Sequence, residues 1–222
     1  EDPIVSDQSH DPEGAGNHGT QILGSLVGHA PGSLVGPAYG SSVILAKTED
    51  ISSETQVEED NWIAAIEWAV DLGADVVSSS VGYYEWYDWS DLDGNTAPIT
   101  LAADMAVLRG AVVVVGVGMM RYDEYWPHIL APADGHHVLA VGMSDLNGYV
   151  SDWSSPGPTY DNRIKPDVLA IGVGNITPIP WTENLYYFTS GTDMSVTLVA
   201  GAAALLIEDD PTLTPFQINE AV

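Results

Sequence analysis

Continuous apolar runs alternate along the chain with segments whose apolar residues recur at helical spacing. Four runs have the length and composition of buried strands, at residues 43–50, 74–82, 111–118 and 137–145. Four segments are predicted to be helices, at residues 18–28, 56–73, 99–110 and 192–208. Because the strand runs are uninterrupted, both faces of the sheet are expected to be covered. This alternation predicts an α/β fold with a mostly parallel, doubly wound sheet.

The rest of the chain is predicted to form loops around one domain. Residues 1–17 are polar and rich in turn formers, residues 83–98 are aromatic and acidic, and a long irregular region precedes residue 192. No internal repeat or interdomain linker is visible, so residues 1–222 are expected to be a single domain. Its first residues resemble the middle of a loop and its last residues the inside of a helix, which suggests truncation at both ends.

Charge is the unusual feature of the composition. The chain has 5 basic and 32 acidic residues, a net charge of −27, while a hydrophobic content of 45% argues against disorder. Such a surface repels nucleic acid and anionic membranes, so neither is an expected partner. It suits cations, basic partners or a salty environment. No apolar run reaches about 18 residues, which predicts no membrane span, and no signal peptide opens the sequence. The absence of cysteine excludes disulfides and thiolate metal sites.

Five motifs follow one another in a diagnostic order. They are NHGTQILGSLVG (17–28), SSSVGY (78–83), RGAVVVVGVG (109–118), VLAVGMSD (138–145) with SDWSSPGP and RIKPDVLAIG after it, and SGTDMSVTLVAGAAALL (190–206). In this order they resemble the subtilisin-like serine peptidases, the subtilase family, over nearly the whole chain. The resemblance implies a three-layer α/β/α domain, a peptide or protein substrate, and secretion to the extracellular space. It implies no required cofactor, with calcium as an optional structural ion.

The resemblance also implies roles for individual residues. His18 would be the general base, the family's oxyanion asparagine is replaced by Met119, and its nucleophilic serine is replaced by Asp193. The substrate-binding strand would be formed by Ser78, Ser79, Ser80, Val81 and Gly82. The family's orienting aspartate comes from a strand before the histidine, but residues 1–17 contain no apolar strand. The chain as given therefore lacks that strand. Because a gap in a sheet leaves backbone groups unpaired, we expect either that another segment or chain supplies the strand or that the sheet is rearranged.

Three interpretations of Asp193 remain open. It is either an N-cap or first-turn carboxylate of the helix that follows, or the partner of His18 in an ion pair, or a working nucleophile, base or metal ligand. A helix N-terminus stabilises a carboxylate and so weakens it as a base and nucleophile. An acyl-aspartate would also be an anhydride, uphill from an amide.

Three functions follow from these readings. The leading one is a serine endopeptidase domain by descent that is inactive or severely impaired in this chain. The second is a pseudopeptidase that binds peptides without cutting them. The third is a hydrolase that uses Asp193 and His18 on a more labile ester or glycosidic bond.

The aromatic and acidic loop offers two further candidate sites. Oxygen ligands at alternate positions around a glycine resemble a calcium loop, and they belong to Asp88, Asp91, Asp93 and Asn95. A solvated acidic turn is the alternative. The aromatic residues of the loop either line a peptide groove or pack over the sheet edge; they are Tyr83, Tyr84, Trp86, Tyr87 and Trp89. The histidines His128, His136 and His137 are interpreted as structural.

Overall fold

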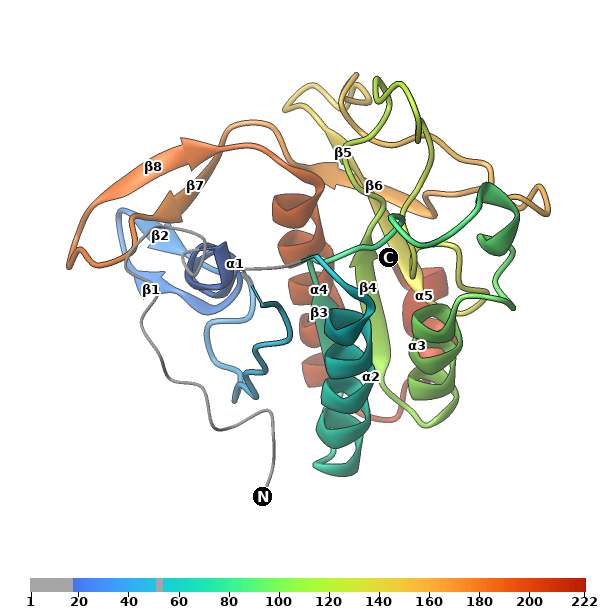
Figure 1. The fold of residues 1–222 in the computed structure, drawn as a ribbon. Coiled ribbons are helices and arrows are strands. Elements are labelled where there is room, and N and C mark those ends of the chain that lie inside the picture. Colours follow the sequence, from blue (N-terminus) through green and yellow to red (C-terminus); the bar gives the residue numbers. More distant parts are fainter. Residues whose placement is uncertain (1–17, 51–53) are drawn as a thin grey trace.

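A four-stranded parallel sheet forms the centre of the protein (Figure 1). The computed structural model describes residues 18–50 and 54–222, so the loop expected at 1–17 lies outside it. The strands are β3 (Val76–Ser79), β4 (Val112–Gly116), β5 (Leu139–Ser144) and β6 (Val168–Ile171), adjacent in that order. All three pairings are parallel, which confirms the α/β fold predicted from the sequence.

Helices cover both faces of this sheet. The helices are α1 (His18–Val27), α2 (Gln56–Asp71), α3 (Pro98–Leu108), α4 (Thr192–Asp209) and α5 (Pro215–Ala221), with a short 3-10 helix, η2 (Trp89–Asp91). On one face, Val113 and Val115 share an apolar cluster with Trp62 of α2 and Val107 of α3. On the other face, the remaining valines of β4 pack in a second cluster with α4. Burial on both faces explains why the β4 sequence is an unbroken apolar run.

Two antiparallel hairpins lie next to α1, at one side of the sheet (Figure 1). One pairs β1 (His29–Ala30) with β2 (Leu34–Val35), and the other pairs β7 (Asn175–Pro178) with β8 (Tyr186–Thr189). The second hairpin is tied to α1 by the Thr177 hydroxyl, which donates to the Gln21 carbonyl at 3.0 Å. The sequence analysis placed β6, β7 and β8 in its irregular region, because these short strands lack a long apolar run.

The prediction of a strand at residues 43–50 is wrong. This segment contains no strand, and the side chains of Val43, Ile44 and Leu45 are 44%, 38% and 65% exposed. The reason is the missing neighbour: β3 is the edge of the sheet, and none of the described strands lies between β3 and this segment. An apolar pattern alone cannot make a strand without backbone to pair with.

A buried carboxylate fixes the aromatic loop between β3 and α3. Glu59 of α2 is only 4% exposed. It accepts hydrogen bonds from the Trp86 indole at 2.6 Å, from the Ile99 backbone N–H at 3.0 Å, and from the Tyr87 hydroxyl. These three donors satisfy the buried charge. At least Trp86 and Tyr87 are therefore held against α2 by hydrogen bonds.

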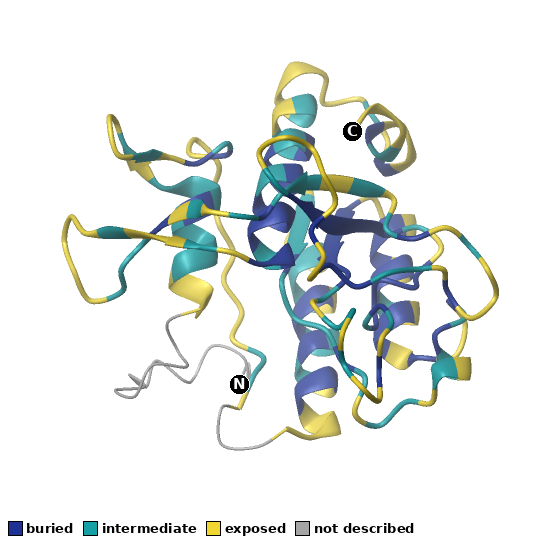
Figure 2. Ribbon diagram, turned by 90° about the horizontal axis from the view of Figure 1, so that it is seen from above, coloured by how far each residue is buried: buried dark blue, intermediate teal, exposed yellow. Residues whose placement is uncertain are grey.

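Exposed residues gather on the outer surfaces of the helices and loops, and buried residues concentrate in the sheet and the helix sides that face it (Figure 2). Across residues 18–50 and 54–222, no helix has the length and apolar character required to cross a membrane.

Replacing Glu59 tests the anchor of the aromatic loop. Glu59→Ala should lower the free energy of unfolding by about 3 kcal/mol, because it leaves buried donors without an acceptor. Urea unfolding followed by tryptophan fluorescence measures the change. Glu67→Ala, on an exposed position of the same helix, is the matched control and should change stability by less than about 0.5 kcal/mol. Equal effects of the two substitutions would contradict the anchoring role.

Candidate active site

Two helix N-termini bring a histidine and a carboxylate together at one side of the sheet. His18 is the first residue of α1, and Asp193 lies in the first turn of α4. The His18 Nε2 and Asp193 Oδ2 atoms are 3.0 Å apart, although 175 residues separate them in the sequence. Their side chains are 46% and 34% exposed. The site is therefore an accessible, hydrogen-bonded ion pair.

Asp193 does not cap its helix. The N-cap of α4 is Gly191, and no side-chain hydrogen bond caps this end. The N-cap alternative is wrong, whereas the first-turn carboxylate and the ion pair with His18 are both present in one arrangement. The Asp193 carboxylate therefore lies at the positive end of the α4 dipole and beside the His18 ring.

The bond to Asp193 raises the pKa of His18 above its ordinary value, and burial partly opposes this increase. The attraction between the two charges raises the pKa further. A larger fraction of His18 is therefore protonated near neutral pH. An imidazolium already bound to a carboxylate is a poor proton acceptor for catalysis.

Met119 lies at the same site, at the end of β4. A Cβ built on Gly191 would lie 3.4 Å from Asp193 Oδ2 and 3.6 Å from Met119 Sδ, so both atoms border one small space. The preceding Gly118 has a φ of +88°, and its carbonyl accepts from the Ser155 N–H at 2.9 Å. This turn directs residue 119 toward the site, but a thioether offers no hydrogen-bond donor to an oxyanion.

Three residues around the start of α4 carry hydroxyl groups: Ser190, Thr192 and Ser195. Ser195 is fully buried and donates to the Ala170 carbonyl at 3.0 Å. Ser190 accepts from the Gly174 N–H at 3.0 Å. Thr192 is 1% exposed. Burial therefore removes Thr192 and Ser195 as accessible nucleophiles, whereas Ser190 is exposed and bonds the Gly174 N–H.

The segment predicted to bind substrate continues from β3. The Ser79 hydroxyl is used internally, because it accepts from the Trp62 indole at 2.9 Å. Gly82 lies so close to Leu130 that a Cβ there would come within 2.9 Å of its side chain. The adjacent Tyr83 forms an antiparallel bridge with Ala131. A substrate role for Ser78, Ser79, Ser80, Val81 and Gly82 stays a prediction.

The acidic residues predicted to bind calcium make local bonds. The Asp91 carboxylate accepts from the Asp88 N–H at 2.9 Å, and the Asp93 carboxylate accepts from the Asn95 N–H at 2.8 Å. Within the described part of the chain, the carboxylates of Asp88, Asp91 and Asp93 do not form a close trio. Calcium binding by this loop stays a prediction.

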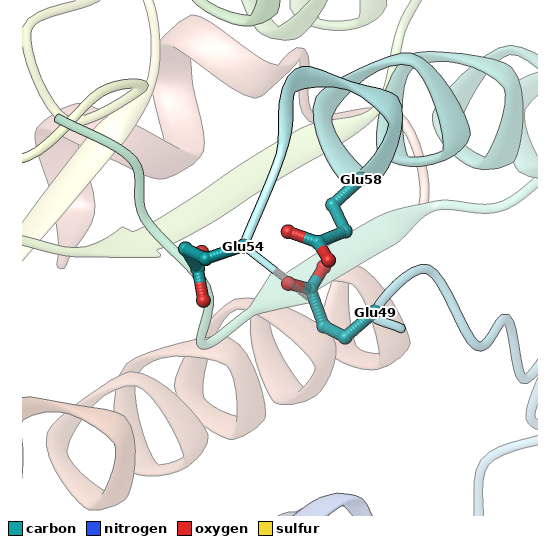
Figure 3. A group of neighbouring side chains, drawn as sticks. All are labelled: Glu49, Glu54 and Glu58. Carbon is teal, nitrogen blue, oxygen red and sulfur yellow. The ribbon is translucent and has the colours of Figure 1, made fainter. Parts of the chain in front are cut away.

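A different acidic trio comes together at the start of α2 (Figure 3). Carboxylate oxygens of Glu49, Glu54 and Glu58 lie within 4.8 Å of one another. The Tyr83 hydroxyl donates to Glu49 at 2.6 Å, and the Thr55 N–H donates to Glu58 at 3.1 Å. Burial and the neighbouring carboxylates raise the pKa of Glu54. Sequence reasoning missed this trio because the residues share no spacing motif. Hydrogen bonds from Tyr83 and Thr55 account for two of its members.

The remaining histidines have structural surroundings. The His128 ring stacks on Trp89 with ring centroids 3.9 Å apart, and burial lowers the pKa of His128. The backbone N–H groups of His136 and His137 both donate to the Asp104 carboxylate at 2.8 Å. The ring contact of His128 agrees with its structural interpretation, whereas the bonds of His136 and His137 involve only their backbone, so the role of those two rings stays a prediction.

The parallel sheet covered by helices, with a histidine–carboxylate pair at two helix N-termini, defines an α/β domain with one accessible polar site. The subtilase family model matches residues 2–222, and the chain belongs to the subtilase family. Subtilisin DY of Bacillus licheniformis is 31% identical, over 97% of this chain and 72% of that protein. Serine protease AprX of Bacillus subtilis (strain 168) is 29% identical over 96% of this chain. The match covers 52% of AprX, so this chain spans about half the length of that relative. The solved structure of the PatG macrocyclase in complex with peptide has a similar fold, with a TM-score of 0.72 and 20% identity, over 90% of this chain and 57% of that one.

The histidine–carboxylate pair makes stability depend on pH in a defined direction. Because the folded-state pKa of His18 is raised, the contribution of its protonated form is fully present below the unfolded-state pKa and is lost as pH rises through the raised value. Asp193→Asn should lower the pKa of His18 toward its ordinary value and remove this pH dependence. NMR titration of the histidine rings measures the pKa, and urea unfolding at several pH values measures stability.

The other histidine rings serve as internal controls and should titrate identically in the two proteins. An unchanged His18 titration in Asp193→Asn would contradict the assignment of the raised pKa to this bond.

Proposed function

We propose that this domain is a subtilisin-like serine peptidase domain that binds peptides but does not cleave them at a significant rate. The observation that carries the proposal is the 3.0 Å pair between His18 and Asp193. In this arrangement the histidine bonds a carboxylate rather than a hydroxyl nucleophile. Membership of the subtilase family supports a peptide as the bound molecule.

The chemistry of the pair explains why cleavage should be slow. Attack by Asp193 on an amide would form an anhydride, and the carboxylate is stabilised by the helix dipole and by His18. Removal of a triad member leaves only about 10³–10⁴-fold catalysis over water. Loss of an oxyanion donor, as with Met119, costs a further factor of about 10²–10³.

A second candidate function rests on the accessibility of the pair. Since the His18 and Asp193 side chains are 46% and 34% exposed, water and a small substrate can reach them. A histidine–carboxylate pair that assists water could hydrolyse an activated ester, which has a far better leaving group than an amide. A labile glycosidic bond is the other substrate class of this candidate.

The location and partners of the domain are part of the proposal. Relatives named as subtilisins support secretion to the extracellular space. The net charge of −27 favours basic peptides over acidic ones and disfavours nucleic acid and anionic membranes. Calcium is proposed only as an optional structural ion of the loop that contains Asp88 and Asn95.

Binding and cleavage are separable in one set of assays. The unmodified chain should bind a fluorescent basic peptide, seen as increased anisotropy, while hydrolysis of a fluorogenic peptide stays at background. The double variant Asp193→Ser with Met119→Asn should gain slow hydrolysis, because it supplies a hydroxyl and an oxyanion donor. Adding His18→Ala to that double variant is the matched control and should abolish the gain. Peptide cleavage by the unmodified chain that is lost in His18→Ala would overturn the proposal.

The second candidate has its own readout. Hydrolysis of p-nitrophenyl acetate by the unmodified chain, falling at least about tenfold in His18→Ala, would support a working histidine–carboxylate pair. Equal rates of ester hydrolysis in the two proteins would contradict that candidate without affecting the peptide-binding proposal.

A further inference from the structure

The turn that carries Met119 is held by a residue far away in the sequence. The turn follows β4, and its Gly118 has a left-handed conformation, with a φ of +88°. The Gly118 carbonyl accepts a hydrogen bond from the Ser155 N–H at 2.9 Å. The Met120 N–H donates to the Ser155 hydroxyl oxygen at 2.8 Å. Ser155 therefore bonds both peptide groups that flank Met119.

Holding both peptide groups fixes the backbone of the residue between them. The Gly118 carbonyl belongs to the planar peptide group before residue 119, and the Met120 N–H belongs to the one after it. The orientations of these two planes define φ and ψ of residue 119. Because the allowed rotamers of a side chain depend on φ and ψ, the direction of the Met119 side chain depends on Ser155.

Ser155 is itself anchored in the core. It belongs to the segment SDWSSPGP at residues 151–158, in which the sequence analysis assigned no individual role. Ser154 and Ser155 are both almost fully buried. The Ser154 hydroxyl oxygen accepts from the Met143 N–H of β5 at 3.1 Å. The Ser154 carbonyl accepts from Arg121 Nε at 3.1 Å, which adds a third contact to the turn. The buried strand β5 therefore supports the position of residue 119.

An apolar side chain also borders the turn. A Cβ built on Gly118 would lie 2.7 Å from Leu130 Cδ1 and 3.4 Å from the Ser155 hydroxyl oxygen. The turn therefore contacts both Leu130 and Ser155. An apolar contact limits how far the turn can move but does not orient its peptide groups, whereas a hydrogen bond is directional. The orientation of the turn therefore comes from Ser155.

We propose that Ser155 is the positioning residue for residue 119, the position of the family's oxyanion asparagine. The two hydrogen bonds hold this residue beside the start of α4, where Met119 Sδ and Asp193 Oδ2 border the space at Gly191. In Met119→Asn, the same contacts would direct the amide donor toward a developing oxyanion, and such a donor is effective only when it is held in place beforehand. The catalytic part of this inference rests on the proposed function, whereas the orientation of Met119 does not.

A matched control separates positioning from stability. Removing a buried hydrogen-bond acceptor destabilises a protein wherever it occurs, so a loss of stability in Ser155→Ala does not test the proposal. Ser154→Ala removes a serine hydroxyl that is equally buried but bonds β5 rather than the turn. The backbone carbonyl that accepts from Arg121 is kept in this control.

The orientation of Met119 is measured by NMR in a chain whose methionine methyl groups are labelled with carbon-13. In the unmodified chain, the Met119 methyl group should show a nuclear Overhauser effect to the Gly191 Hα atoms, because Met119 Sδ lies beside Gly191. Ser155→Ala should shift the Met119 methyl resonance and abolish this effect, whereas Ser154→Ala should change neither. The methyl resonance of Met105, on the exposed side of α3, is the internal reference and should not move.

The catalytic part is measured in the double variant Asp193→Ser with Met119→Asn. Adding Ser155→Ala should lower kcat at least about tenfold and change KM less than about twofold, because an oxyanion donor acts in the transition state. Adding Ser154→Ala should lower kcat less than about twofold. A double variant without any hydrolysis would contradict the proposed function, and the NMR measurement would still decide the orientation of Met119.

Two results would overturn the proposal. One is an unchanged Met119 methyl resonance in folded Ser155→Ala, and the other is an equal effect of Ser154→Ala and Ser155→Ala on that resonance or on kcat. If Ser155→Ala does not fold, amide hydrogen exchange of the unmodified chain provides the test. The Met120 N–H should exchange at least about tenfold more slowly than an unstructured amide. Exchange at the unstructured rate would contradict the bond to Ser155.

Discussion

The burial of β4 on both faces is the constraint on which the rest of the structure depends. Its valines point alternately into the cluster with α2 and α3 and into the cluster with α4. This packing aligns the parallel strands, so their carboxyl ends meet at one edge of the sheet. Met119 follows β4 directly, and α4 begins nearby with Asp193. The site is thus positioned by the core rather than by its own loops.

The long, fully apolar elements could be predicted from the sequence, and the short or half-exposed ones could not. The strands β3, β4 and β5 and the helices α1 to α4 follow from period and length. The hairpin strands β7 and β8 have four residues each and carry mixed side chains, so their pairing depends on contacts with α1. The prediction of a strand at 43–50 failed for the opposite reason: the segment has the pattern of a strand, but none of the described strands pairs with it.

The candidate site, too, could be predicted only in part from the sequence. The motif order identified His18, Met119 and Asp193, and the structure brings these three together. The sequence could not decide between a capping and a paired aspartate, because both place an acid in the first helical turn. Only the distance between two side chains 175 residues apart separates these cases. The hydrogen bonds to Glu59 could not be predicted from the sequence either, because its three donors lie far from it along the chain.

The net charge of −27 also determines how copies of the molecule interact in solution. Mutual repulsion keeps copies of the molecule apart in dilute buffer, where electrostatic forces extend about 30 Å at 0.01 M salt but only about 3 Å at 1 M. Concentrated salt removes that repulsion and strengthens apolar contacts. The solubility of this protein, including its handling during purification, is therefore governed by ionic strength acting on its acidic surface.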